Sequence, residues 1–350
     1  MSDTYRRVVS AAAVSPDLPA LPVLDLRQSA DPATAPVFRD ALREATHEYG
    51  FFYLIGHGLE AERIAELFAV ARRFFALPEA DKLAIENLHS PHFRGYTRLG
   101  GERTQGKQDW REQIDIGPER PAITPRTADW DVLQGPNQWP TALPELREVV
   151  TAWNASMAQV GLRLLREWAE SLGQDRAVFD PAFAVDPSEL TKVVRYPGLP
   201  DDGAAQGVGA HQDSGVLTLL LVEPGSVGLQ AEHDGEWVDV PSVDGALVVN
   251  IGELLEYATD GYLRATVHRV VAPGPGTDRI SVPYFFNPAL SARVPRLTLP
   301  PELATEARGV TVDPANTIHD TYGANALKSR LRAHPDVAAR HHPDLVARLG

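Results

Sequence analysis

The first half of the chain shows three stretches of helical periodicity. Apolar residues recur three and four positions apart over residues 35–49, 60–76 and 145–172. A glycine or a Leu-Pro pair follows each stretch and is typical of a helix end. Between the first two, residues 51–55 form an unbroken apolar run that predicts a buried strand, and residues 21–27 predict a shorter one.

From residue 190 onward the pattern changes to short extended segments. It predicts strands at residues 191–196, 216–222, 228–231, 236–240, 246–251, 266–272 and 280–286, separated by turns of Gly, Pro, Asp and Ser. Many short strands with regular punctuation are typical of a β-sandwich or jelly roll. Residues 313–349 return to a mostly helical pattern.

Residues 90–115 fit neither pattern. This stretch carries Phe93, Arg94 and Tyr96 among several glycines, with little apolar periodicity. Such a composition is typical of a loop over a surface or a site entrance. An ordinary solvated loop and a loop that faces a substrate are both compatible with it.

Composition and charge limit the class of protein. Hydrophobic residues make up 43% of the 350 residues and charged residues 23%, the balance of a soluble globular protein. The net charge of -14 argues against nucleic acid or an anionic membrane as the main partner. Because the chain has no cysteine, any metal must be held by His, Asp or Glu. Without a membrane-length apolar run or an apolar signal core, we expect a cytoplasmic protein that is a monomer or a weak homo-oligomer.

His211 and Asp213 stand two positions apart, just before the apolar run at residues 216–222. Side chains two apart on an extended segment point to the same side, so an imidazole nitrogen and a carboxylate oxygen can reach a common point. Two histidines and one carboxylate form the facial triad that holds non-haem Fe(II) and leaves positions open for a cosubstrate and O2. An isolated H-x-D also occurs in ordinary surface loops, so the hypothesis depends on a third ligand.

The third ligand candidate is His268, which lies 55 positions after Asp213 on the predicted strand 266–272. A double-stranded β-helix, where distant strands lie side by side, closes such a separation. Arg279 and Ser281 follow, two apart on the last predicted strand and therefore on one face. A guanidinium beside a hydroxyl suits a buried carboxylate. His57, in a glycine turn, is interpreted as a structural residue.

In this order, H-x-D, a distant His and R-x-S resemble the isopenicillin N synthase-like group of Fe(II)/2-oxoglutarate-dependent dioxygenases. Residues 21–25, 49–58, 74–78, 94–96, 135–140, 196–197, 228–230, 249–252 and 268–269 also resemble stretches of that family. The resemblance implies an α+β fold, mainly β in its core. An N-terminal region (1–185) would pack on a double-stranded β-helix, or jelly roll (186–300), followed by a C-terminal helical segment (301–350), in one compact unit.

The same resemblance implies roles for particular residues. Fe(II) would be bound by His211, Asp213 and His268, and the distal carboxylate of 2-oxoglutarate by Arg279 and Ser281. Tyr196 commonly lies near that carboxylate in the family. Lys192 shares strand parity with Tyr196, so it faces either the same pocket or solvent.

The implied reaction consumes 2-oxoglutarate and O2 and releases succinate and CO2. It would hydroxylate, desaturate or cyclise a small molecule of secondary metabolism. Substrate contacts are expected from Phe93, Arg94 and Tyr96, and the helical segment near residues 319–332 is expected to fold across the iron. Its charges Lys328, Arg330 and Arg332 are interpreted as a solvated helix face.

Two alternatives remain open at this point. An Fe(II) oxidase of the same fold, independent of 2-oxoglutarate, uses R-x-S to hold a substrate carboxylate. Isopenicillin N synthase itself has a metal-binding Gln near its C-terminus, whereas this chain has no Gln after Gln230. A non-catalytic small-molecule-binding protein is disfavoured by the intact ligand set. The carboxylate of Asp213 also argues against a halogenase, which needs that position free for chloride.

Overall fold

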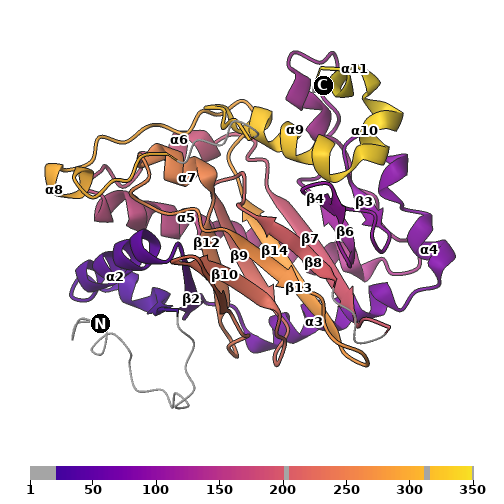
Figure 1. Ribbon diagram of the computed structural model, residues 1–350, viewed down its shortest axis with the longest axis horizontal. Coiled ribbons are helices and arrows are strands. Elements are labelled where there is room, and N and C mark those ends of the chain that lie inside the picture. Colours follow the sequence, from indigo (N-terminus) through magenta and orange to yellow (C-terminus); the bar gives the residue numbers. More distant parts are fainter. Residues whose placement is uncertain (1–20, 201–204, 311–315, 349–350) are drawn as a thin grey trace.

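The larger of two β-sheets has the strand order β1-β2-β12-β9-β14-β7-β6-β3 in the computed structural model, which describes residues 21–200, 205–310 and 316–348 (Figure 1). Neighbouring strands pair antiparallel except for the parallel pair β1 and β2. The strands are β1 (Val23–Asp25), β2 (Phe51–Ile55), β3 (Gly95–Thr97), β6 (Glu112–Ile116), β7 (Leu190–Pro197), β9 (Leu217–Val222), β12 (Leu247–Ile251) and β14 (Asp278–Phe286).

The smaller sheet has the order β11-β10-β13-β8 and packs against one face of the larger one. Its strands are β8 (Gln206–His211), β10 (Leu229–His233), β11 (Glu236–Asp239) and β13 (His268–Val271). Tyr53, Val194 and Val222 of the larger sheet share an apolar cluster with Val208 and Val270 of the smaller sheet. This face-to-face packing of strands from distant parts of the chain confirms the predicted jelly roll.

Long amphipathic helices cover the other face of the larger sheet. They are α2 (Ala35–Glu48), α3 (Ala61–Phe75) and α5 (Glu145–Ser171), within one residue of their predicted bounds. Their apolar stripes share the main core with Val282 and Phe286 of β14. Gly161 of α5 permits this contact, because a Cβ at that position would lie 2.6 Å from the ring of Phe286.

Shorter elements fill the connections. The hairpin β4 (Arg103–Thr104) and β5 (Lys107–Gln108) contacts β8. The short helices are η1 (Leu26–Ala30), α4 (Glu79–Leu83), η2 (Asn87–His89), η3 (Asp129–Leu133), α6 (Asp180–Phe183), α7 (Glu253–Ala258) and α8 (Pro301–Ala304). The chain closes with α9 (Tyr322–Ala333), α10 (Pro335–His341) and α11 (Pro343–Val346), as the helical pattern there predicts. Within the described ranges, none of the helices is both long and apolar enough to cross a membrane.

The interpretation of residues 90–115 as a loop was wrong for much of this stretch. β3 and β6 are buried strands of the larger sheet, and β6 pairs with β7 along its whole length. β6 lacks the apolar pattern of a buried strand, because its residues Gln113 and Asp115 are polar yet buried on the face toward the smaller sheet. Four strands that precede residue 185, namely β1, β2, β3 and β6, therefore extend the sheet of the jelly-roll core.

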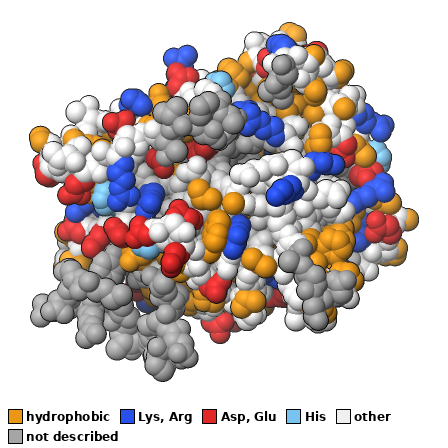
Figure 2. Space-filling view, in the orientation of Figure 1, with side chains coloured by type: hydrophobic (Ala, Val, Ile, Leu, Met, Phe, Trp, Pro, Cys, Tyr) orange, Lys and Arg blue, Asp and Glu red, His pale blue; other side chains and the backbone are white. Residues whose placement is uncertain are grey.

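The surface mixes charges of both signs. Figure 2 shows hydrophobic side chains in small groups among acidic and basic ones on the face it presents. The exposed large apolar side chains of the described residues, such as Val37, Val185 and Val227, are distant in sequence. Scattered single apolar residues are normal on a soluble protein, so the expected monomer or weak homo-oligomer stays a prediction.

Candidate metal and cosubstrate site

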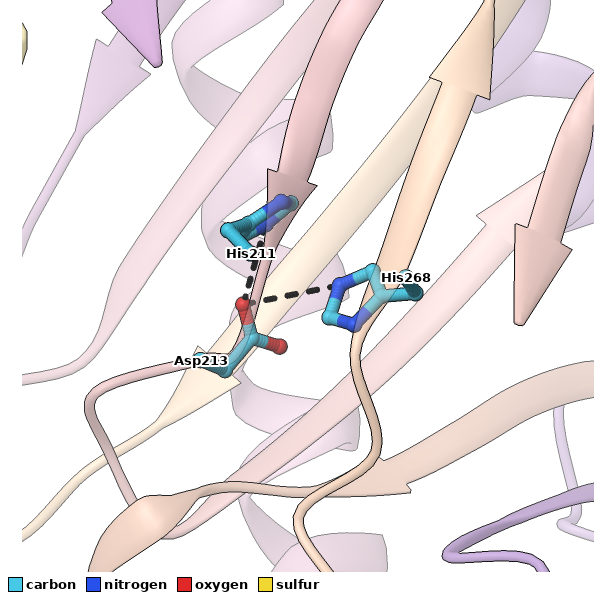
Figure 3. Close-up of side chains that lie close together, drawn as sticks. All are labelled: His211, Asp213 and His268. Atoms are coloured by element: carbon cyan, nitrogen blue, oxygen red, sulfur yellow. Dashed lines mark ion pairs between the residues drawn. The ribbon is translucent and has the colours of Figure 1, made fainter. Parts of the chain in front are cut away.

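Three side chains meet at one end of the smaller sheet. His211 ends β8, Asp213 follows it, and His268 begins β13 directly opposite His211 (Figure 3). Nε2 of His211 lies 3.5 Å from Oδ1 of Asp213, and Nε2 of His268 lies 3.8 Å from the same oxygen. One donor atom from each residue lies within 4.8 Å of the others, so one ion can contact all three.

Both imidazole rings are oriented by backbone carbonyl groups. Nδ1 of His211 lies 2.9 Å from the carbonyl oxygen of Gly209, and Nδ1 of His268 lies 3.0 Å from that of Thr266. A carbonyl can only accept, so Nδ1 carries the proton and Nε2 keeps its lone pair for a metal. Burial lowers the pKa of His268 to about 4, which keeps its ring neutral at neutral pH.

Asp213 is held so that one oxygen faces the histidines. Its Oδ2 accepts hydrogen bonds from Oγ1 of Thr218 at 2.6 Å and Nδ2 of Asn250 at 2.8 Å. Burial opposes ionisation, but His268, His211 and the Thr218 hydrogen bond together hold the pKa of Asp213 below its ordinary range. The carboxylate is therefore charged at neutral pH and offers Oδ1 to an ion.

Thr218 and Asn250 were not recognised from the sequence. They lie on neighbouring strands, β9 and β12, and are paired directly across the sheet. Asn250 does fall within residues 249–252, which resemble the family, but a role for it depends on knowing that β12 lies next to β9. Thr218 did not stand out in the sequence either, because threonine is a common residue in strands.

Thr218→Val is expected to lower the affinity for Fe(II) about tenfold or more, the usual effect of removing a group that orients a metal ligand. The substitution keeps the shape of the side chain but removes the hydroxyl that holds Oδ2 of Asp213. The measurement is an anaerobic Fe(II) titration. Thr218→Ser is the matched control and should keep most of the affinity, whereas equal affinities of Thr218→Val and wild type would contradict this role.

Behind the triad, Arg279 lies buried with unused hydrogen-bond donors. It is 2% exposed, and its Cζ lies 5.0 Å from the ring centroid of Tyr196, the residue paired with it on β7. In the described part of the chain, Nε and Nη1 of Arg279 have no acceptor and the residue forms no ion pair. Ser281 lies two positions along β14 and so shares its face. A bidentate carboxylate fits this arrangement.

Arg279 and Tyr196 lie close to β8, the strand that ends in His211. A Cβ on Gly207 would lie 3.0 Å from the ring of Tyr196, so β8 passes next to that ring four residues before His211. Tyr196 and Val208 of β8 belong to the same apolar cluster between the two sheets. Arg279, which is paired with Tyr196, and the metal-ligand strand β8 therefore border the same apolar cluster between the two sheets.

Lys192 is buried, so of the two directions that its parity left open, the one toward solvent is wrong. It lies on the same face of β7 as Tyr196, as its parity predicts. Its Nζ donates to both carboxylate oxygens of Glu102, at 2.7 and 2.9 Å, and lies 3.6 Å from Asp115. Its charge is thus already paired, at a position four residues along β7 from Tyr196. Its contact with 2-oxoglutarate stays a prediction.

Tyr96 does not face the site, and its expected substrate contact is wrong. It is paired with Ile114 on the face of the sheet that packs against the helices. Its hydroxyl donates to Oε2 of Glu112 at 2.6 Å, and its ring meets Phe74 of α3 edge-on. The reason is that alternate residues of a strand point to opposite faces, and Tyr96 lies at a position of β3 that faces the helices. A loop would not have fixed this direction.

Phe93 and Arg94 are buried beside the C-terminal helices. The ring of Phe93 stacks on His342 at 5.6 Å, which fixes it against the end of α10. Nη2 of Arg94 donates to the carbonyl of Leu133 at 3.0 Å, whereas its Nε has no partner among the described residues. Burial lowers the pKa of Arg94 to about 10, so the guanidinium remains charged at neutral pH. Arg94 therefore still needs an acceptor.

The C-terminal helix α9 lies beside the metal ligands. Oγ of Ser329 is 3.1 Å from Oγ of Ser214, the residue directly after Asp213. Figure 1 shows this helix near β4, which it contacts. The interpretation of its charges as solvated was wrong for two of them, because Lys328 is 8% exposed and Arg330 pairs with buried Asp115 at 2.9 Å. Arg332 is exposed, as that interpretation expects.

His57 has the structural role expected of it. Its Nε2 lies 2.9 Å from the carbonyl oxygen of Gly245, and its Nδ1 accepts the backbone N–H of Leu59 at 3.2 Å. These contacts hold the glycine turn after β2 against the loop that precedes β12. Neither ring nitrogen of His57 is available to a metal.

A jelly roll that carries two histidines and a carboxylate beside a buried, unpaired arginine defines the class of non-haem Fe(II) oxygenases. Two family models match the chain. The non-haem dioxygenase in morphine synthesis N-terminal family matches residues 21–142, and the 2OG-Fe(II) oxygenase superfamily matches residues 188–288. The chain belongs to the Fe(II)/2-oxoglutarate-dependent dioxygenases and is an oxidoreductase that uses Fe(II), 2-oxoglutarate and O2.

Named relatives span nearly the same length. The chain is 34% identical to the 2-oxoglutarate-dependent dioxygenase frbJ of Dothideomycetidae sp., over 94% of each protein. It is 31% identical to a homoarginine-6-hydroxylase of Arabidopsis thaliana, over 81% of this chain and 89% of that one. A solved 2OG-Fe(II) oxygenase family protein from Caulobacter crescentus superposes with a TM-score of 0.71 at 28% identity, covering 90% of this chain and 99% of that one.

Proposed function

We propose that the enzyme hydroxylates a small molecule of secondary metabolism, with His211, Asp213 and His268 as the protein ligands of one Fe(II). Bound iron, together with 2-oxoglutarate and O2, supplies the oxidising chemistry. The protein would supply only three ligands to the ion, so further positions would be left for small molecules. The relative named as a 6-hydroxylase supports hydroxylation over desaturation or ring closure.

The observation that carries this proposal is the unpaired guanidinium of Arg279. A cation that is 2% exposed and has two free donors is costly unless a ligand supplies acceptors. The distal carboxylate of 2-oxoglutarate fits these donors, with Ser281 as a further donor on the same face and Tyr196 alongside. Its keto-acid end would then point along the interior toward the triad.

Anaerobic reconstitution tests the proposal directly. Adding Fe(II) and then 2-oxoglutarate should give a visible charge-transfer absorption, because the keto acid chelates the metal. On exposure to air with substrate, succinate should be released in step with product. Substrate oxidation at full rate without 2-oxoglutarate would instead support the oxidase alternative.

Arg94→Ala is expected to raise KM for the substrate or to uncouple 2-oxoglutarate decay from product formation. The reason is the unpartnered Nε of this buried cation, which a polar group of the substrate can satisfy. Steady-state kinetics with succinate and product measured together separates the two effects. Iron binding should be unchanged.

Tyr96→Phe, two residues further along the chain on β3, is the control for Arg94→Ala. Its hydroxyl bonds Glu112 on the helix-facing side, so its removal should leave KM and coupling unaltered. Unaltered kinetics and coupling in Arg94→Ala as well would exclude Arg94 from substrate binding.

A further inference from the structure

A network of buried charges lies on the face of the larger sheet toward the smaller sheet, on the same face of β7 as Tyr196. The register of β6 and β7 makes Gln113, Asp115 and Lys192 point to the same side as Tyr196. Asp115 is 1% exposed and binds Arg330 of α9 at 2.9 Å. The network thus fills the space between the sheet and the helix that lies beside Asp213.

The network also reaches the metal-binding strand. Arg111 is held between Glu102 and Asp109, with 3.1 Å to each carboxylate. Asp109 in turn accepts the backbone N–H of Gly209 at 3.3 Å, two positions before His211. The network therefore connects β8, which carries His211, with α9.

The charges of the network balance. Its three carboxylates belong to Glu102, Asp109 and Asp115. Its three cations, which pair with them, are Arg111, Lys192 and Arg330. Burial opposes ionisation of Glu102, but the charges of Arg111 and Lys192 hold its pKa well below the usual range. The nearby His334 is neutral because burial lowers its pKa to about 4. A ligand of large net charge would disturb this balance.

Two atoms of the network lack a partner within the described ranges. Oε1 of Gln113 is an acceptor on a fully buried side chain, and Nε of Arg111 is a donor on a side chain that is 8% exposed. The two residues are two positions apart in sequence. Buried polar atoms are nearly always hydrogen-bonded, so a ligand with one donor and one acceptor would supply the missing partners. We call the side of the network formed by Arg111 and Gln113 the wall.

We propose that this wall is the substrate subsite, an inference that rests on the proposed function. The substrate is a small polar compound of the amino-acid or amide type. Its N–H group donates to Oε1 of Gln113, and its carbonyl or carboxylate oxygen accepts from Nε of Arg111. An apolar ring system such as a flavonoid binds poorly here, because it would leave both atoms unpaired beside buried charges.

The experiment uses the full chain loaded anaerobically with Fe(II) and 2-oxoglutarate. Free amino acids and their N-acetyl amides are added, with naringenin as the flavonoid, and binding is followed by the change in charge-transfer absorption. At least one amino acid or amide should bind, and Gln113→Leu should weaken its binding about tenfold or more. The affinity for 2-oxoglutarate should not change in Gln113→Leu.

Gln108→Leu is the matched control, because Gln108 is exposed on the β4–β5 hairpin. It should bind the same compound as tightly as wild type. The inference is overturned if none of the amino acids or amides binds, if naringenin binds better than they do, or if Gln113→Leu binds equally well. Absence of the charge-transfer absorption before any substrate is added would instead count against the proposed function.

Discussion

Asp213→Ala is expected to abolish both Fe(II) binding and 2-oxoglutarate turnover. Asp213 supplies the one carboxylate of the triad, with Oδ1 at 3.5 and 3.8 Å from the two histidine Nε2 atoms. Without it, two neutral imidazoles remain, and the buried donors of Thr218 and Asn250 lose their acceptor. Anaerobic Fe(II) titration and succinate release in air measure the two losses.

Asp239→Ala is a suitable control for Asp213→Ala, because Asp239 is an exposed carboxylate on β11 of the same sheet. It should bind iron as the wild type does. Circular dichroism shows whether each variant is folded. Normal turnover of Asp213→Ala without any added ligand would show that the metal assignment is wrong.

The helices and most strands of this fold could be predicted because the spacing of their apolar residues matches the faces that they bury. α2, α3 and α5 each bury one stripe against the large sheet, so their periodicity gives bounds within one residue. β9 and β12 are almost continuously apolar because both of their faces are covered. The prediction failed for β6, where Gln113 and Asp115 are buried in a polar network instead of an apolar core.

The candidate site could be predicted as far as single strands determine it. R-x-S places Arg279 and Ser281 on one face of β14, as parity predicts. H-x-D brings His211, at the end of β8, close to Asp213 just beyond it. The partners of these residues depend on which strands are neighbours. Thr218 lies next to Asn250 only because β9 pairs with β12. Lys192 binds Glu102 only because the segment just before β4 lies over β7. Neither pairing is visible in a local pattern.

Arg279→Ala is expected to lower the affinity for 2-oxoglutarate roughly a hundredfold. Removing one partner of a buried charge pair costs about 3 kcal/mol or more, and each 1.4 kcal/mol is about a factor of ten. Arg279 meets this condition because it is 2% exposed and no carboxylate in the described part of the chain pairs with it. Titration of the Fe(II)-loaded variant with 2-oxoglutarate, followed by charge-transfer absorption, gives the affinity.

Three further variants make the Arg279 result specific. Ser281→Ala should weaken 2-oxoglutarate binding less than Arg279→Ala, because only a neutral hydroxyl is lost. Arg279→Lys keeps the charge without the planar fork, so its affinity should fall between those of wild type and Arg279→Ala. Arg63→Ala, on the exposed surface of α3, should change nothing. If Arg279→Ala bound 2-oxoglutarate normally but lost affinity for the substrate, this arginine would hold a substrate carboxylate, as it does in the oxidase alternative.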